Sequence, residues 1–151
     1  MEINYSSTYP DRMVRDGLKR IINYDIRELS SEEIKNLWDI EHPEGGEPDN
    51  GFIHEHKYSY KSTKVGRTRW NYSGIVEAIV RDKYTNDQME AITNNMNVIV
   101  AEFFNVLVTG GILSATKYLV ESINDENSAN FKAMQEWRAL AKKEAREVLK
   151  I

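Results

Sequence analysis

The three histidines of the chain lie close together in sequence and are the residues with the clearest capacity for chemistry. They are His42, His54 and His56, and three glutamates stand among them, Glu41, Glu44 and Glu55. Imidazole and carboxylate groups bind zinc, and a His-x-His pair on a strand would point both rings to one face, so a metal site is one interpretation. The spacing matches no specific zinc motif. The second interpretation is that the histidines are exposed to solvent in an acidic loop. We favour the second interpretation and predict no metal and no other cofactor.

Nucleophilic and phosphate-transfer chemistry lacks its usual sequence signatures in this chain. No serine lies in a GxSxG elbow, and the chain contains no cysteine, which excludes a thiol nucleophile, a disulfide and a thiolate metal site. The glycines form neither GxGxxG nor GxxxxGK[ST], so the sequence does not indicate a phosphate-binding loop. We therefore predict that the protein is not an enzyme.

Two blocks of opposite charge follow each other near the middle of the chain. Between Asp39 and Glu55 there are six acids and no basic residue, and between Lys57 and Arg69 there are five basic residues and no acid. Basic residues interleaved with aromatic rings bind single-stranded nucleic acid in one interpretation, and an acidic protein neighbour in the other. The net charge of −4 opposes a polyanion, so we favour the protein neighbour. The predicted partner-binding residues are Lys57, Tyr58, Tyr60, Lys61, Arg67, Arg69 and Trp70.

Composition favours one compact domain without a membrane span. The chain has 151 residues, of which 40% are hydrophobic and 29% are charged, as in ordinary globular proteins. The first residues contain no apolar run, so we expect no secretory signal. The stretch from Met96 to Leu113 approaches the length of a membrane helix, but Glu102, two asparagines and two glycines interrupt it. We interpret that stretch as buried protein core.

In the first half of the chain, residues 1–40 are expected to form helices. From Asp11 to Leu29 apolar residues recur at steps of three and four, which is typical of an amphipathic helix. Ser30 and Glu33 form a capping box that predicts a second, short helix. Residues 41–70 should then form an exposed loop followed, near residues 52–70, by an extended charged arm or weak β-hairpin.

Residues 71–151 are expected to form a helical assembly core. A helix should run from Asn71 to Tyr84, and a second capping box, Thr85 with Gln88, should start another that ends at the Gly110-Gly111 pair. The apolar run within this segment is rich in β-branched residues, so helix or strand stays open for residues 96–113. Further helices are expected over residues 112–123 and 131–150. The predicted fold class is mainly α, a helical bundle.

Two stretches of the second half together resemble a known family. They are Asn71–Asn95, with the sequence NYSGIVEAIVRDKYTNDQMEAITNN, and Phe131–Ala145, with the sequence FKAMQEWRALAKKEA. They resemble a helical module of small virion structural proteins from tailed phages of gut Bacteroidales, including crAss-like phages. The matching positions are Ile75, Val76, Ile79, Val80, Tyr84, Ala91, Ile92, Trp137 and Ala141.

The resemblance implies a non-catalytic phage virion protein that is made in the bacterial cytoplasm. Such a protein would be an adaptor that attaches fibre or decoration proteins to the capsid, as a head fibre or auxiliary capsid component. The alternative is a nucleic-acid-binding or regulatory protein that uses residues 57–72. Because the segment after Met89 is apolar on more than one face, we also expect a homo-oligomer, most simply a dimer. The predicted oligomer contact comprises Ile99, Phe103, Phe104 and Leu107.

Overall fold

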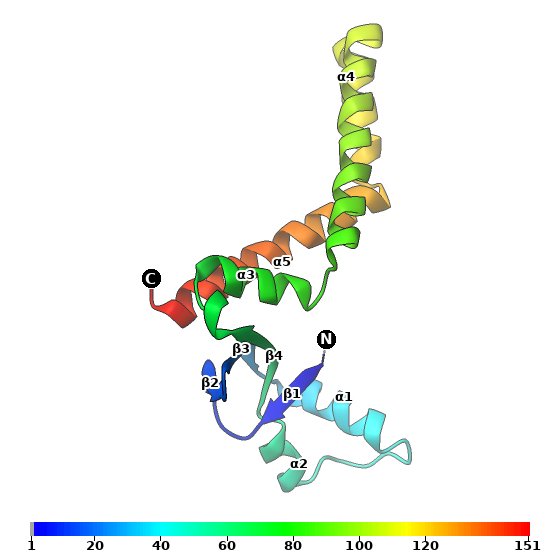
Figure 1. The fold of residues 1–151 in the computed structure, drawn as a ribbon. Helices are drawn as coiled ribbons and strands as arrows, with labels where there is room; N and C mark the ends of the chain where they lie inside the picture. Colours follow the sequence, from blue (N-terminus) through cyan, green and yellow to red (C-terminus); the bar gives the residue numbers. More distant parts are fainter. Residues whose placement is uncertain (1) are drawn as a thin grey trace. The chain divides into compact units, whose positions relative to one another are not determined.

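The computed structural model describes residues 2–151 and shows a mixed fold of helices and strands (Figure 1). Of the chain, 61% is helix and 18% is strand, in five α-helices and one four-stranded antiparallel sheet. The prediction of a mainly α helical bundle is therefore wrong. The chain divides into two compact units. We call Met1–Ile79 with Lys142–Ile151 the sheet unit, and Val80–Ala141 the hairpin unit.

The sheet has the strand order β1-β4-β3-β2, and every neighbouring pair is antiparallel. Its strands are β1 (Ile3–Ser6), β2 (Met13–Asp16), β3 (Lys19–Glu28) and β4 (Tyr58–Gly66). Gly17 adopts a φ of 59° in the two-residue turn between β2 and β3, a conformation that glycine allows at low cost. In β3 the side chains of Ile22 and Tyr24 are fully buried, so this central strand carries much of the core.

The helix expected from Asp11 to Leu29 is wrong, because this segment forms β2 and β3. Part of the three- and four-residue spacing of its apolar residues arises because the chain reverses at Gly17, and part lies within β3, whose register shifts between Tyr24 and Arg27. The buried part of β3 contains an isoleucine pair and a tyrosine, which favour strands over helices. Pairing with β4, some forty residues later, fixes this choice, and a local pattern does not contain that information.

The capping box at Ser30 and Glu33 is confirmed. It starts α1 (Ser31–Glu41), where the Ser30 hydroxyl accepts from the backbone N–H of Glu33 and the Glu33 carboxylate accepts from that of Ser30. A loop follows, as expected, but residues 50–55 form a short helix, α2 (Asn50–Glu55), where an extended arm was predicted. Most of the rest of that predicted arm is β4, a strand between β1 and β3, and a 3₁₀ helix, η1 (Arg67–Arg69), follows it. The buried residues of β4 are small or β-branched, namely Ser59, Thr63 and Val65.

A tight turn leads from the sheet into α3 (Tyr72–Arg81). The side-chain oxygen of Asn71 accepts from the backbone N–H of Gly74 at 2.9 Å. A Cβ atom on Gly74 would lie 2.1 Å from the carbonyl oxygen of Arg69, so only glycine fits this close approach. Within the sheet unit, Arg12 also forms ion pairs of 2.6 Å with both Glu144 and Glu147 near the end of the chain.

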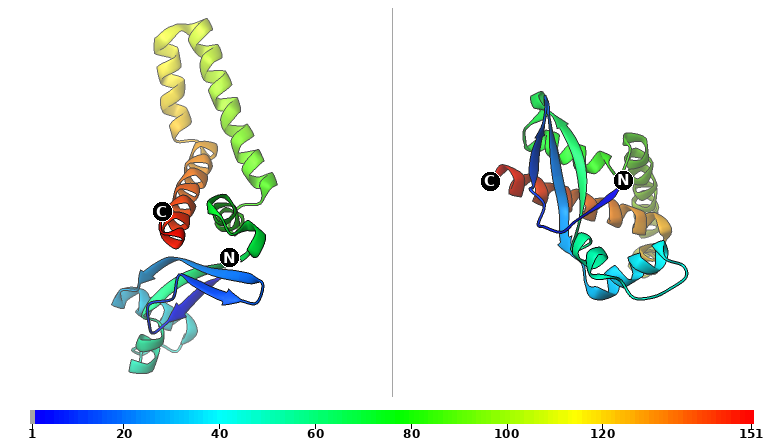
Figure 2. Two further views of the ribbon diagram at one scale, coloured as in Figure 1. Left: turned by 60° about the vertical axis from the view of Figure 1, so that its left-hand side comes forward. Right: turned by 90° about the horizontal axis from the view of Figure 1, so that it is seen from below.

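The hairpin unit is built on α4 (Asn86–Ile123) and most of α5 (Glu126–Leu149). The capping box of Thr85 and Gln88 that starts α4 is confirmed, and residues 96–113 are helical except at Gly111. Gly111 has non-helical backbone angles, with φ 77° and ψ −180°, at the point where the sequence predicted a helix end. There α4 folds back into two arms that lie side by side (Figure 2, left). We call them the first arm, 86–110, and the second arm, 112–123, of a helical hairpin.

Candidate functional site

Two of the three histidines, His42 and His56, pack as aromatic rings in the sheet unit. His42 stacks on Trp38 with ring centroids 3.6 Å apart, and His56 stacks on Phe52 at 3.9 Å. The Nδ1 atom of each histidine lies near the backbone carbonyl oxygen of its stacking partner, at 3.2 Å and 2.9 Å respectively. His54 is exposed on α2. Within residues 2–151, no group of three or more histidine and carboxylate side chains is placed to hold a metal ion.

The predicted partner-binding residues lie along β4 and the turn that follows it. Three of their cations face acids of the same unit: Lys57 lies 4.0 Å from Glu28, Lys61 pairs with Asp25, and Arg69 pairs with Glu77. Tyr58 packs edge-on against Tyr9 with ring centroids 5.7 Å apart. The Trp70 ring lies 4.3 Å below the guanidinium of Arg20. The segment is thus integrated into the sheet unit, and its binding role stays a prediction.

A basic cluster that the sequence pattern did not reveal surrounds the turn between β2 and β3. Arg15, Lys19, Arg20 and Arg67 line an open cavity of about 290 Å³ at this turn. Arg15 and Arg20 stand directly opposite each other in the paired strands, an arrangement that ordinarily costs stability. The cluster was not predicted because residues 11–29 were expected to form a helix, whereas the cluster comes together only when β2 pairs with β3.

The most exposed apolar surface of the hairpin unit lies on α4. By length and composition, α4 is the one helix within residues 2–151 that is long and apolar enough to cross a membrane. Only 6% of its most apolar window is buried, and Ala115 is the sole fully buried residue of the helix. The expectation that Met96 to Leu113 forms buried core is therefore wrong. A helix that is apolar all round normally has neighbours on more than one side, and α4 here has too few.

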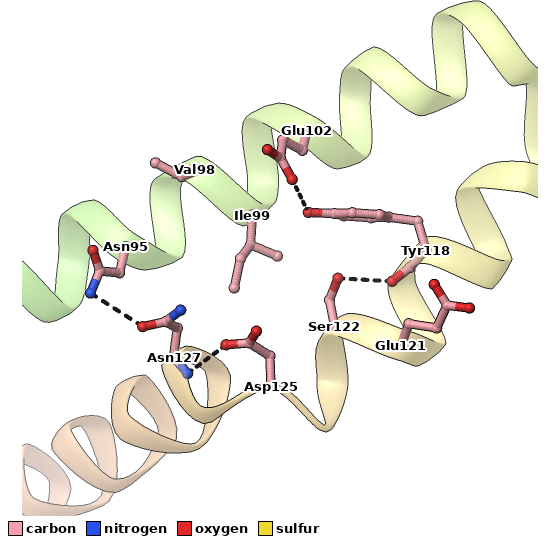
Figure 3. Close-up of a pocket in the computed structure, with 9 residues that line it drawn as sticks. All are labelled: Asn95, Val98, Ile99, Glu102, Tyr118, Glu121, Ser122, Asp125 and Asn127. Carbon is pink, nitrogen blue, oxygen red and sulfur yellow. Dashed lines mark hydrogen bonds between the residues drawn. The ribbon is translucent and has the colours of Figure 1, made fainter.

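A seam of half-buried side chains joins the two arms of the hairpin. Ile99 points toward the second arm (Figure 3), and Phe103 and Leu107 follow it at four-residue steps on the same face. From the second arm, Ala115, Tyr118 and Ser122 lie on the corresponding face. Three of the four predicted oligomer-contact residues thus belong to the seam within the chain. The fourth, Phe104, is 57% exposed.

One face of the hairpin is polar and hydrogen-bonded (Figure 3). The phenol of Tyr118 donates to the carboxylate of Glu102 at 2.6 Å, across the two arms. Near the base of the hairpin, Asn95 donates to the side chain of Asn127 at 3.2 Å. An open cavity of about 430 Å³ lies between these groups and is lined largely by polar residues, Glu121 among them. This face suits contact with water.

The opposite face, which we call the apolar face, carries six exposed apolar side chains. They are between 41% and 84% exposed: Val100, Phe104, Val108, Ile112, Leu119 and Ile123. In each arm they lie about 100° round the helix from the seam, because most of them directly follow a seam residue in sequence. Viewed from the N-terminus of either arm, the apolar row lies about 100° clockwise from the seam. Because the two arms are antiparallel and face each other across the seam, the two rows point to the same side of the hairpin.

Most positions before the seam are polar, the exceptions being Val98 and Val106 in the first arm. Glu102 precedes Phe103, Ser114 precedes Ala115, Lys117 precedes Tyr118 and Glu121 precedes Ser122. The same geometry therefore places them on the side opposite the apolar face. The hairpin is two-faced, with charge and hydrogen bonds on one side and aliphatic and aromatic carbon on the other.

Comparison of the chain with protein-family models, with curated proteins and with solved structures found no match. The proposed function therefore rests on the two faces of the hairpin.

Proposed function

We propose that the chain is a non-catalytic assembly protein whose helical hairpin binds another protein through the apolar face. The observation that supports this function is the continuous row of apolar side chains, up to 84% exposed, along one side of the hairpin. Contiguous apolar surface of this kind marks interaction sites in soluble proteins, since leaving it in water is costly. Phe104 and its neighbours are the expected anchors, because aromatic and large aliphatic side chains dominate binding energies.

A protein partner fits this hairpin better than a lipid bilayer does. A membrane helix needs about 20 predominantly apolar residues, and the second arm, Ile112–Ile123, is shorter than that. Lipid would also surround both faces, and burying Glu102, Lys117 and Glu121 in hydrocarbon is expensive. A protein surface that covers only the apolar face leaves these three side chains in water.

The particle in which this assembly takes place is, we propose, a phage virion. The resemblance of Asn71–Asn95 and Phe131–Ala145 to virion structural proteins supports this proposal. A homo-oligomeric adaptor needs one surface that joins its copies and another that binds the capsid, fibre or decoration proteins. The apolar face of the hairpin would supply the first, and the charged surface of the sheet unit the second.

Mass spectrometry of purified phage particles tests the virion proposal. We expect the chain in particles, with a fixed copy number relative to the major capsid protein. Particles assembled with a Phe104→Glu chain should contain much less of it, whereas a Ser114→Glu chain, altered on the polar face, should be incorporated normally. Absence of the unaltered chain from purified particles would refute the virion role.

The basic cluster supports a second candidate function, binding of single-stranded nucleic acid. Arg15, Lys19, Arg20 and Arg67 surround one cavity, and the Trp70 ring lies beside it, under the guanidinium of Arg20. A gel shift with single-stranded DNA that weakens as salt rises, and that is lost in an Arg15→Ser, Lys19→Ser double variant, would support this function. No shift at low salt would exclude it.

A further inference from the structure

We infer that the partner of the apolar face is the same face of a second copy of this chain, so that two hairpins form a four-helix bundle with two-fold symmetry. This inference rests on the proposed function, since it names the protein that the apolar face binds. Its basis is the placement of charge, the spacing of the apolar residues and the area that they expose.

Placement of charge makes the apolar face complementary to itself. Between Met96 and Ile123 the charged side chains are Glu102, Lys117 and Glu121, and all three lie on the polar face. A two-fold contact brings each patch onto its own copy, so a charge near the axis would meet an identical charge and a charge elsewhere would be buried against apolar side chains. The apolar face avoids both that repulsion and the cost of burying an unpaired charge.

The one hydroxyl in the apolar row of the second arm is already satisfied within its own helix. Thr116 lies between Ile112 and Leu119, and its hydroxyl donates to the carbonyl oxygen of Ile112 at 2.8 Å. A buried hydroxyl with an internal acceptor costs much less than an unpaired one. Thr116 can therefore enter a dry interface.

Spacing along the second arm is that of a helix that packs against other helices. Ile112, Thr116, Leu119 and Ile123 follow one another at steps of four, three and four, which is the a/d pattern of bundles and coiled coils. In the first arm, Val100, Phe104 and Val108 form a row at steps of four, one of the ridges used in helix packing. A second hairpin supplies two matching antiparallel helices, and the result is a four-helix bundle.

The exposed area is close to what one side of a stable dimer provides. Applying the exposed fractions of the six residues to side chains of roughly 150–200 Å² gives about 600 Å² of apolar surface, against about 800 Å² per partner in a standard interface. Leu113 and Val120, which are also exposed and border the face, would supply much of the remainder.

Measuring the mass of the full chain in solution, by light scattering and sedimentation over a range of concentrations, tests the inference. The unaltered chain should have the mass of two copies and dissociate on dilution. Phe104→Glu and Ile112→Glu, each altered on the apolar face, should each raise the dimer dissociation constant at least about tenfold. Ser114→Glu, at an exposed position on the polar face of the second arm, should leave it unchanged. Circular dichroism should show native helix content in all three variants.

Three results would overturn the inference, and they differ in what they say about the proposed function. A chain that stays monomeric at every concentration, while Phe104→Glu still blocks incorporation into particles, removes the second copy but keeps the binding face. A dimer that Ser114→Glu disrupts and Phe104→Glu does not places the contact elsewhere. A monomer that floats with vesicles of phosphatidylcholine and phosphatidylglycerol, and loses this binding in Phe104→Glu, replaces both proposals with a membrane contact.

Discussion

The phenol of Tyr118 donates a 2.6 Å hydrogen bond to the carboxylate of Glu102, and this bond joins the two arms of the hairpin on its polar face. The bond, together with desolvation, raises the pKa of Tyr118 above its ordinary value of 10.0. A group with a raised pKa stabilises the fold while it is protonated. The contribution of this bond is therefore complete below pH 10 and is lost as the pH rises through the raised pKa.

Glu102→Gln should lower the pKa of Tyr118, because a neutral amide no longer disfavours the phenolate. The titration of the ¹³C-labelled tyrosine ring by NMR measures this change, with Tyr118→Phe used to assign the signal. Glu121→Gln, on the same face but without a bond to Tyr118 in the described structure, is the matched control. An unchanged Tyr118 titration in Glu102→Gln would show that the bond does not persist in solution.

Acid should weaken the start of α1 through Glu33. The backbone N–H of Ser30, the Arg27 guanidinium and the Ser30 hydroxyl all bond its carboxylate and lower the pKa of Glu33 from 4.5 to about 2. A lowered pKa stabilises the fold above pH 4.5, and this contribution is lost as the pH falls toward 2. The melting temperature should therefore fall as the pH is lowered from 4.5 toward 2, and it should fall less in Glu33→Gln than in the unaltered chain. Glu32→Gln, its exposed neighbour, should keep the dependence of the unaltered chain.

Removal of Arg12 should strongly destabilise the sheet unit. The Glu144 side chain is only 6% exposed, and Arg12 is its ion-pair partner at 2.6 Å. Arg12→Met leaves that carboxylate buried without its cation, which we expect to lower the free energy of unfolding by about 2–4 kcal/mol. Denaturant unfolding measures this change. Adding Glu144→Gln to Arg12→Met should recover part of the lost free energy of unfolding. If the effects of the two substitutions simply add, Arg12 and Glu144 do not interact energetically.

Gly111 should resist substitution by any residue with a side chain. A Cβ atom there meets nothing within 4 Å, so the cost comes from the backbone alone, at φ 77° and ψ −180°. Only glycine commonly adopts these angles, and Gly111→Ala should cost about 1–3 kcal/mol of stability or straighten α4 into one continuous helix. Thermal unfolding detects the first outcome, and distances between spin labels on the two arms detect the second. Thr109→Ala, an exposed position in the preceding turn, should cause neither.

Sequence patterns predicted the features that a few neighbouring residues determine. The capping boxes at Ser30 and Thr85 and the helix break at Gly111 are of this kind, since each depends on contacts within a turn of chain. The pairing of β3 with β4 escaped prediction because β4 lies much later in the sequence. Strand β2 and the basic cluster around Arg15 and Arg20 depend instead on the local β2–β3 hairpin, whose turn at Asp16-Gly17 is a short-range signal that the helical spacing of residues 11–29 outweighed.

For the hairpin, sequence patterns did not distinguish the residues that join the two arms from those that stay exposed. The sequence indicated apolar surface on more than one side of α4, and the exposure of that helix agrees with this. Separating the seam from the apolar face required the fold at Gly111, because only then does Ile99 turn toward the second arm while Phe104 stays exposed. Adjacent residues such as Phe103 and Phe104 thus have different contacts: the first packs within the hairpin, and the second is available to the proposed partner.

The bend at Gly111 also bears on the order in which the protein forms. Contacts within the hairpin join residues close in sequence, as Glu102 and Tyr118 do, so their loop closes with little loss of chain entropy. Pairing of β3 with β4 closes a longer loop, which contains α1 and α2. When the full chain refolds, the hairpin is therefore expected to form early and to expose Phe104 and Ile112 before the sheet is complete. An apolar face that is exposed at high concentration favours aggregation, so refolding yield should fall as the concentration rises.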